Sequence, residues 1–119
     1  MARIWIYFDF DVIRQEFAKL PVKDRAKLLA LMEHYAVVGN GNPSPARIDD
    51  YGGGLYRLRH IKSAYQGRVI FFSSHKAEGN ERLVVLTVFK KETRSIPASI
   101  LDRARARQAE YLRRNKLDE

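Results

Sequence analysis

One segment, Leu83–Phe89 (LVVLTVF), is apolar at six of its seven positions and does not alternate with charged residues. A short run of this kind, rich in β-branched residues, is typical of a central β-strand covered on both faces. Such a strand needs a strand on each side and a layer of structure above and below it. The rest of the chain must therefore supply both neighbouring strands and covering helices.

Two further strand-like runs, Leu55–His60 and Arg68–Ser73, precede this segment. Alternation along the first run places Arg57 and Arg59 on the same face of the strand. The residues at 78–81 have the composition of a tight turn. We therefore predict an antiparallel meander of three strands.

A strand and two helices are predicted ahead of the meander. Arg3–Phe8 is β-branched and aromatic, which favours a strand. The carboxylates that follow suit a helix N-terminus, and Pro21 ends that short helix. Its inward residues would be Val12, Ile13, Phe17 and Leu20.

The clearest helix in the sequence is Val22–Val38. At 100° per residue one arc collects its apolar side chains: Leu28, Leu29, Leu31, Met32, Tyr35 and Ala36. The glycine- and proline-containing segment 39–43 ends this helix, and a loop is expected as far as Gly54.

A last helix is predicted after Ser95–Pro97, where proline is tolerated in the first turn. Its inward stripe would be Ile100, Leu101, Ala104, Tyr111 and Leu112. The element order β-α-α-β-β-β-α predicts an α+β fold: a small, mostly antiparallel sheet with two N-terminal helices and a C-terminal helix. We expect residues 1–119 to form one domain.

Composition restricts the chemistry. The chain has 119 residues and no cysteine, which excludes disulfides, thiolate zinc sites and a cysteine nucleophile. The net charge is +8, and residues 51–119 hold all of the excess, with 15 basic and 7 acidic residues. This asymmetry favours a polyanionic partner such as nucleic acid, an acidic protein or a membrane surface. No run is long enough to span a bilayer and the N-terminus lacks signal-peptide order, so we expect a cytoplasmic protein.

Several common kinds of site have no pattern in this sequence. The three histidines lack the spacing of a zinc site. Gly52–Gly54 is followed by a strand rather than a helix, so it lacks the helix dipole of a phosphate-binding loop. No GxSxG motif indicates a serine hydrolase. We expect neither a metal nor a cofactor.

The remaining candidate is a basic cluster on the sheet, made of Arg57, Arg59, Arg68, Lys90 and Lys91. In an antiparallel meander the end of one strand lies beside the start of the next, so these five could line one groove. Such a cluster neutralises phosphates and stabilises the added negative charge of a phosphorane. The alternative is a solvated face of long amphipathic side chains.

Four segments in order resemble the RelE/ParE toxin superfamily, and within it the HigB-like, phage-derived branch. They are Leu55–Arg59, Gly67–Phe72, Leu86–Pro97 and the A-x-x-R-x-x-x-Y pattern that ends at Tyr111. The resemblance implies the toxin of a type II toxin–antitoxin pair. That toxin would be an endoribonuclease that cuts mRNA in the A site of the 30S subunit of the ribosome, silenced by a cognate acidic antitoxin. Attack by the 2′-hydroxyl would need no metal.

The resemblance also implies residue roles. Arg57 and Arg59 occupy two basic positions on the first central strand, Arg68 the phosphate-clamping arginine, and Lys91, with Lys90 beside it, the basic position after the last strand. Arginine keeps its proton in proteins and is a poor general base. HigB-like members often use a histidine or an acid, which makes His60 and His75 the candidate bases.

Contacts to RNA outside the catalytic positions are expected from the basic side chains that follow the sheet: Lys90, Arg94, Arg103 and Arg107. The antitoxin could wrap the basic half or contact the N-terminal helices. Three alternatives stay open: a ParE-like gyrase poison, a non-catalytic basic nucleic-acid-binding module, and a degenerate toxin that keeps only the fold.

Overall fold

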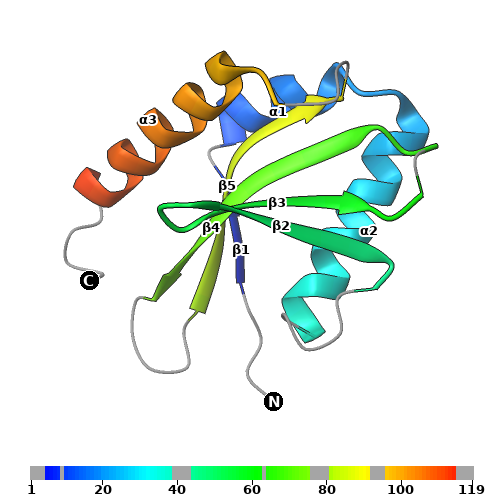
Figure 1. Cartoon of the computed structure of the whole chain (residues 1–119), viewed down its shortest axis with the longest axis horizontal. Helices are drawn as coiled ribbons and strands as arrows, with labels where there is room; N and C mark the ends of the chain where they lie inside the picture. The colour runs from blue at the N-terminus through cyan, green and yellow to red at the C-terminus, as the bar shows by residue number, and fades with distance from the viewer. Residues whose placement is uncertain are drawn as a thin grey trace.

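Five strands form a mixed sheet in the order β1-β5-β4-β3-β2 (Figure 1). The computed structural model describes residues 5–8, 10–38, 44–62, 64–75, 81–91 and 96–114. The elements are β1 (Trp5–Phe8), α1 (Phe10–Ala18), α2 (Val22–Val38), β2 (Ala46–Gly52), β3 (Leu55–His60), β4 (Gly67–His75), β5 (Glu81–Lys90) and α3 (Ala98–Arg114). The predicted α+β class, with two helices before the meander and one after it, is confirmed.

β5 is the central strand that its apolar sequence predicts. It lies between β1, to which it is parallel, and β4, to which it is antiparallel. Both faces are covered: Leu83 and Val85 pack with α1 and α2, whereas Val84 and Leu86 pack with α3. Burying this apolar surface supplies much of the driving force for folding.

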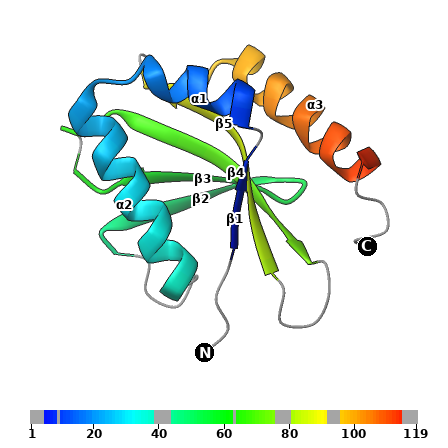
Figure 2. The same ribbon diagram turned by 180° about the vertical axis from the view of Figure 1, so that it is seen from behind.

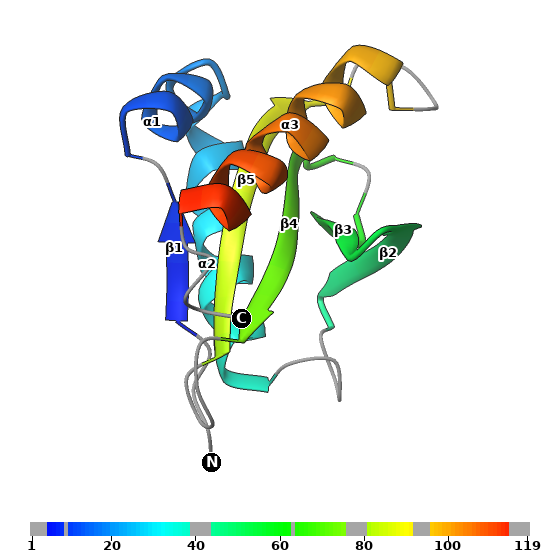
Figure 3. The same ribbon diagram turned by 90° about the vertical axis from the view of Figure 1, so that its left-hand side faces the viewer.

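The helices form two layers, one on each face of the sheet. α2 lies behind β2 and β3 in Figure 1 and in front of them in Figure 2, which is drawn from the opposite side. α3 lies over β4 and β5, and β2 and β3 extend beyond it (Figure 3). One face of the sheet near β2 and β3 is therefore left outside the cover of α3.

The bounds of α2 match the predicted helix. Two of the apolar residues predicted to face inward, one in α1 and one in α2, are exposed. Leu29 is 45% exposed and Val12 of α1 is 37% exposed. Leu29 lies about 100° around the helix from the buried Leu28, at the margin of the face that meets the sheet. Tyr35, Met32 and Leu31 are buried as predicted.

The loop expected up to Gly54 is wrong, because Ala46–Gly52 forms β2 and pairs antiparallel with β3. Its charged sequence favours a loop locally, and pairing with β3 overrides that tendency at the edge of the sheet. Gly52, Gly53 and Gly54 have φ values of 80°, 61° and 80° and make the turn between the two strands. Glycine adopts this left-handed conformation without steric cost.

Glu16 of α1 accepts hydrogen bonds from the part of β5 that lies beyond its pairing with β1. In the described ranges, the register of β1 with β5 ends at Val85. Farther along β5, Glu16 Oε1 accepts hydrogen bonds from Thr87 Oγ1 and Val88 N, both at 3.0 Å. The Glu16 carboxylate thus supplies the acceptor that a longer β1 would have supplied.

Candidate functional site

The structure brings Arg57, Arg59 and Arg68 together on one face of the sheet. Arg57 pairs with Ile70 across β3 and β4, and Ile70 belongs to the core under α3. Arg59 and Arg68 lie two residues from this pair on their own strands, so alternation places them on the same face. Arg47 of β2, opposite Arg59 in the register, extends the group. These four residues are called the arginine cluster below.

Arg68 is the buried member of the arginine cluster, with 2% of its surface exposed. Its Nη1 donates to Tyr65 O at 2.9 Å and to Gly67 O at 3.1 Å, while its buried Nε has no hydrogen-bond partner within the described part of the chain. Burial, with the charges of Arg57 and Arg59, lowers the pKa of Arg68 to about 10. The guanidinium therefore lacks full compensation for its positive charge.

Asp49 of β2 links the other members of the cluster. Its Oδ2 accepts hydrogen bonds from Arg57 Nε at 3.2 Å and Arg57 Nη2 at 2.7 Å. Arg59 Nε lies 3.9 Å from Asp49 Oδ2, and Arg47 Nε lies 3.7 Å from Asp49 Oδ1. Sequence reasoning missed Asp49 because the segment was expected to be a loop. The alternation of Arg47, Asp49 and Tyr51 was the available signal.

Tyr51 forms an aromatic contact at the same site. The Arg57 guanidinium carbon lies 5.6 Å from the centroid of the Tyr51 ring, which is a cation–π geometry. Burial raises the pKa of Tyr51, and the nearby Arg57 opposes the shift. The phenol therefore stays protonated at neutral pH and can donate a hydrogen bond.

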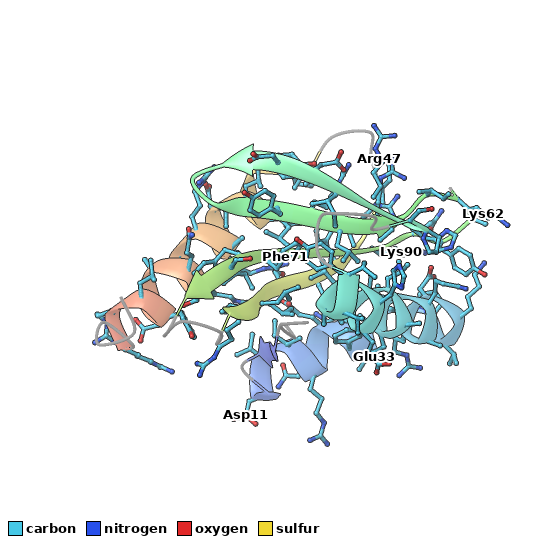
Figure 4. All side chains as sticks on the ribbon, turned by 90° about the horizontal axis from the view of Figure 1, so that it is seen from below. Asp11, Glu33, Arg47, Lys62, Phe71 and Lys90 are labelled. Atoms are coloured by element: carbon cyan, nitrogen blue, oxygen red, sulfur yellow. The ribbon has the colours of Figure 1, made fainter. Side chains whose placement is uncertain are left out.

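Arg47 points away from α2, which carries Glu33 (Figure 4).

Lys90 does not join the arginine cluster, contrary to the expected single groove. It is opposite Gly67 in the register, and a Cβ on Gly67 would meet Leu28 of α2 at 3.4 Å. Lys90 therefore belongs to the face that α2 covers, because residues paired across a sheet share a face. Lys91 is exposed at the end of β5, and its N–H donates to Gln66 O at 2.8 Å.

His60 lies on the opposite face of the sheet from Arg57 and Arg59. It is 6% exposed, its Nδ1 accepts a hydrogen bond from Lys62 N at 3.0 Å, and its ring centroid is 4.7 Å from that of Tyr65. Burial, together with the charges of Lys27 and Lys62, lowers the pKa of His60. The structure therefore separates this candidate base from the arginine cluster.

The lowered pKa of His60 predicts a pH dependence of stability. The unfolded chain takes up a proton near pH 6.5 whereas the folded chain resists it, so the free energy of unfolding should fall as the pH drops below about 6.5. His60→Asn keeps an acceptor for Lys62 N–H but cannot titrate. Urea denaturation at pH 7.5 and 5.0 should show a smaller loss for this variant than for the wild type. An equal loss in both proteins would contradict the assignment.

His75 is distant from the arginine cluster along β4. His75 ends β4, at the opposite end of that nine-residue strand from Arg68, and its side chain is outside the described residues. The seven residue steps from Arg68 to His75 correspond to about 23 Å between their Cα positions. Arg94 also lies outside the described residues.

Arg103 and Arg107 of α3 are engaged within the protein. Arg107 Nη1 donates to both carboxylate oxygens of Glu16, at 3.1 and 3.0 Å, and to Leu86 O at 2.9 Å. Arg103 Nη2 donates to Thr87 Oγ1 at 3.1 Å, and its Nε lies 3.6 Å from Glu16 Oε2. These bonds join α3 to α1 and β5, so a large part of the hydrogen-bonding capacity expected for RNA is used structurally.

Asp24 of α2 holds the segment that precedes Arg68. This buried carboxylate accepts a hydrogen bond from Gln66 N at 2.8 Å. Gln66 O in turn accepts from Lys91 N, and Gly67 packs closely against Leu28. The backbone carbonyls that bind the Arg68 guanidinium are thereby fixed from the other side of the sheet.

The fold and the site define a small α+β protein with a concentrated cationic surface beside its C-terminal helix. Guanidinium groups can bind phosphate through charge-assisted hydrogen bonds. No helix in the described ranges is long and apolar enough to cross a membrane.

Comparison with known proteins assigns the family. Residues 15–109 match the family described as "Phage derived protein Gp49-like (DUF891)". The chain is 32% identical over 97 residues to the "Probable endoribonuclease HigB1" of two Mycobacterium tuberculosis strains, CDC 1551/Oshkosh and ATCC 25618/H37Rv. Each alignment covers 82% of this chain and 71% of the relative. The chain belongs to the Gp49-like phage-derived family, and its resemblance to the HigB-like branch is confirmed.

Proposed function

We propose that this protein is the toxin of a type II toxin–antitoxin pair and acts in the cytoplasm as an endoribonuclease on mRNA in the ribosomal A site. The observation that carries the proposal is the arginine cluster, in which Asp49 is within ion-pair distance of three guanidinium groups and the buried Arg68 lies near Arg57 and Arg59. Membership of the Gp49-like family and similarity to a probable endoribonuclease support it. The partner that silences it would be an acidic antitoxin.

The proposed reaction is attack of a ribose 2′-hydroxyl on the adjacent phosphorus. The hydroxyl proton passes to a base, the P–O5′ bond breaks, and the leaving oxygen takes up a proton. The products are a 2′,3′-cyclic phosphate and a 5′-hydroxyl. Arg57 and Arg59 would stabilise the additional charge on the phosphorus oxygens, and the buried Arg68 would add positive potential from behind them.

The guanidinium geometry supports this assignment. The bonds from Arg57 to Asp49 use Nε and Nη2, and the bond from Arg59 to His60 O at 3.1 Å uses Nη1. A phosphate could therefore approach Arg57 Nη1 and Arg59 Nη2 without displacing these bonds. Positioning of the ribose and base would come from the ribosome, which supplies proximity and orientation.

Inducible expression in a bacterium tests the proposal. The wild type should arrest growth and produce new mRNA 5′ ends within translated frames. Arg57→Gln with Arg59→Gln should abolish both effects. A matched double variant, Arg113→Gln with Arg114→Gln, removes the same charge from the exposed end of α3 and should retain them.

The other outcomes are interpreted only when each variant is shown to be expressed in soluble form. Growth arrest without RNA cuts would point to a protein target such as gyrase and overturn the ribonuclease assignment. No arrest by the wild type would favour a binding module or a degenerate toxin. Equal loss of cutting in both double variants would show that total charge, rather than the arginine cluster, controls activity.

A further inference from the structure

Asp49 lies at the centre of the arginine cluster, on a strand that the sequence did not reveal. In the register of β2 with β3, Asp49 is opposite Arg57, and Arg47 is opposite Arg59. The carboxylate is therefore within ion-pair distance of cations on both strands. Its side chain is 27% exposed, against 62% for Arg47.

The contacts of Asp49 are suited to fixing arginine side chains in place. Two hydrogen bonds converge from Arg57 on a single oxygen, Oδ2, which also faces Arg59 Nε. The Arg57 and Arg59 side chains are only 15% and 19% exposed. A long side chain loses considerable rotamer freedom when it is held this way, so a cation ordered before the ligand arrives loses less on binding.

The charges of the cluster show why one carboxylate does not abolish anion binding. Four arginines and one aspartate leave a net charge of three positive units. Burial is the main cause of the lowered pKa of Arg68, and the charges of Arg57 and Arg59 add to it, so the cations of the cluster lie close enough to repel one another. Asp49 can therefore order the guanidinium groups while the site still attracts phosphate.

We infer that Asp49 is a positioning residue, which sets the relative placement of Arg57 and Arg59 so that both reach one phosphate. This inference rests on the proposed ribonuclease function. It assigns to Asp49 neither proton transfer nor contact with the substrate. A carboxylate that merely competed with phosphate for the arginines would slow the reaction, and its removal would speed the reaction. The positioning role predicts the opposite effect.

Asp49→Asn tests the inference, with Asp50→Asn as a charge-matched control. Asp50 is exposed on the next position of β2 and its Oδ1 accepts a hydrogen bond from Gly52 N at 2.8 Å, an acceptor that asparagine keeps. Both variants raise the net charge by one unit. Any change in general attraction to RNA should therefore be common to the two variants.

Single-turnover cleavage of mRNA on programmed ribosomes separates rate from binding. For Asp49→Asn we expect the maximal rate constant to fall at least tenfold, with a half-saturating concentration no higher than that of the wild type. Asp50→Asn should stay within about twofold of the wild-type rate, and Asp49→Glu should recover part of the loss. A faster maximal rate for Asp49→Asn, or equal rates in both asparagine variants, would overturn the inference.

Arginine side-chain NMR supplies a readout that does not require cleavage. The Nε–Hε signal of Arg57 should be sharp and protected from exchange in the wild type and in Asp50→Asn, and should lose protection in Asp49→Asn. If the wild type cleaves no RNA, the proposed function fails. Asp49 is then judged by these spectra and by inorganic phosphate titration: unchanged spectra and unchanged phosphate affinity would overturn its positioning role.

Discussion

Glu16→Ala is expected to lower the free energy of unfolding by about 2–3 kcal/mol, because it leaves buried hydrogen-bond donors of β5 without their acceptor. The Glu16 side chain is 12% exposed and accepts hydrogen bonds from Thr87 Oγ1, Val88 N and Arg107 Nη1. Alanine would leave a backbone donor of β5 and the Arg107 cation without their acceptor. The three elements that meet there, α1, β5 and α3, would lose their common contact.

Urea denaturation followed by circular dichroism measures this effect. Glu33→Ala, which removes an exposed carboxylate from α2, should change stability by less than about 0.5 kcal/mol. Glu16→Gln keeps one acceptor oxygen without the charge and should give an intermediate loss. A loss below about 1 kcal/mol for Glu16→Ala would show that the ion pairs with α3 contribute little.

Arg68→Met is expected to reduce RNA cleavage by about 100-fold, the effect of removing one charge-stabilising group from an active site, without destabilising the fold. Burial lowers the pKa of Arg68 to about 10, a shift that corresponds to a cost of about 3 kcal/mol for holding the cation in the folded state. Methionine removes that cost and fills similar space. The lost hydrogen bonds from the charged guanidinium to Tyr65 O and Gly67 O offset about 3 kcal/mol, which is nearly all of that gain.

The gain and the loss nearly cancel, so the Tm of Arg68→Met should stay within a few degrees of the wild-type value. Thermal unfolding and single-turnover cleavage of the same preparation check both parts. Because the pKa is lower in the folded state than in the unfolded chain, the cost is present below pH 10 and is relieved only above it. A lower Tm would mean that the two carbonyl contacts outweigh the buried charge. Wild-type cleavage rates would exclude Arg68 from the reaction.

Much of the fold could be predicted because the relevant sequence signals are local. The 3.6-residue period predicted the helix α2, Pro21 and the segment 39–43 predicted its bounds, and the apolar run predicted β5 as a central strand. β2 could not be predicted in the same way, since ARIDDYG has a weak strand preference by itself. It forms a strand because β3 supplies the hydrogen-bonding partner, which is a tertiary effect.

The same distinction between local and long-range signals applies to the candidate site. Alternation along β3 was sufficient to place Arg57 and Arg59 on one face. The position of Lys90 required the register with Gly67, and the discovery of Asp49 required the register of β2 with β3. Both registers depend on long-range pairing, so sequence alone could not supply them. The roles of Arg57, Arg59 and Arg68 in catalysis stay predictions.

Because β2 is an edge strand, the part of the site that it carries should open more readily than the centre of the sheet. In the described sheet β2 has a single neighbour, β3, whereas β5 is held on both sides. Detaching an edge strand breaks one ladder and exposes little of the core, so its amides should exchange with solvent before those of β4 and β5. Local detachment of β2 would therefore separate Asp49 from Arg57 and Arg59 while the rest of the protein stays folded. A ligand that bridges Arg59 of β3 and Arg47 of β2 would hold the two strands together and slow amide exchange along β2.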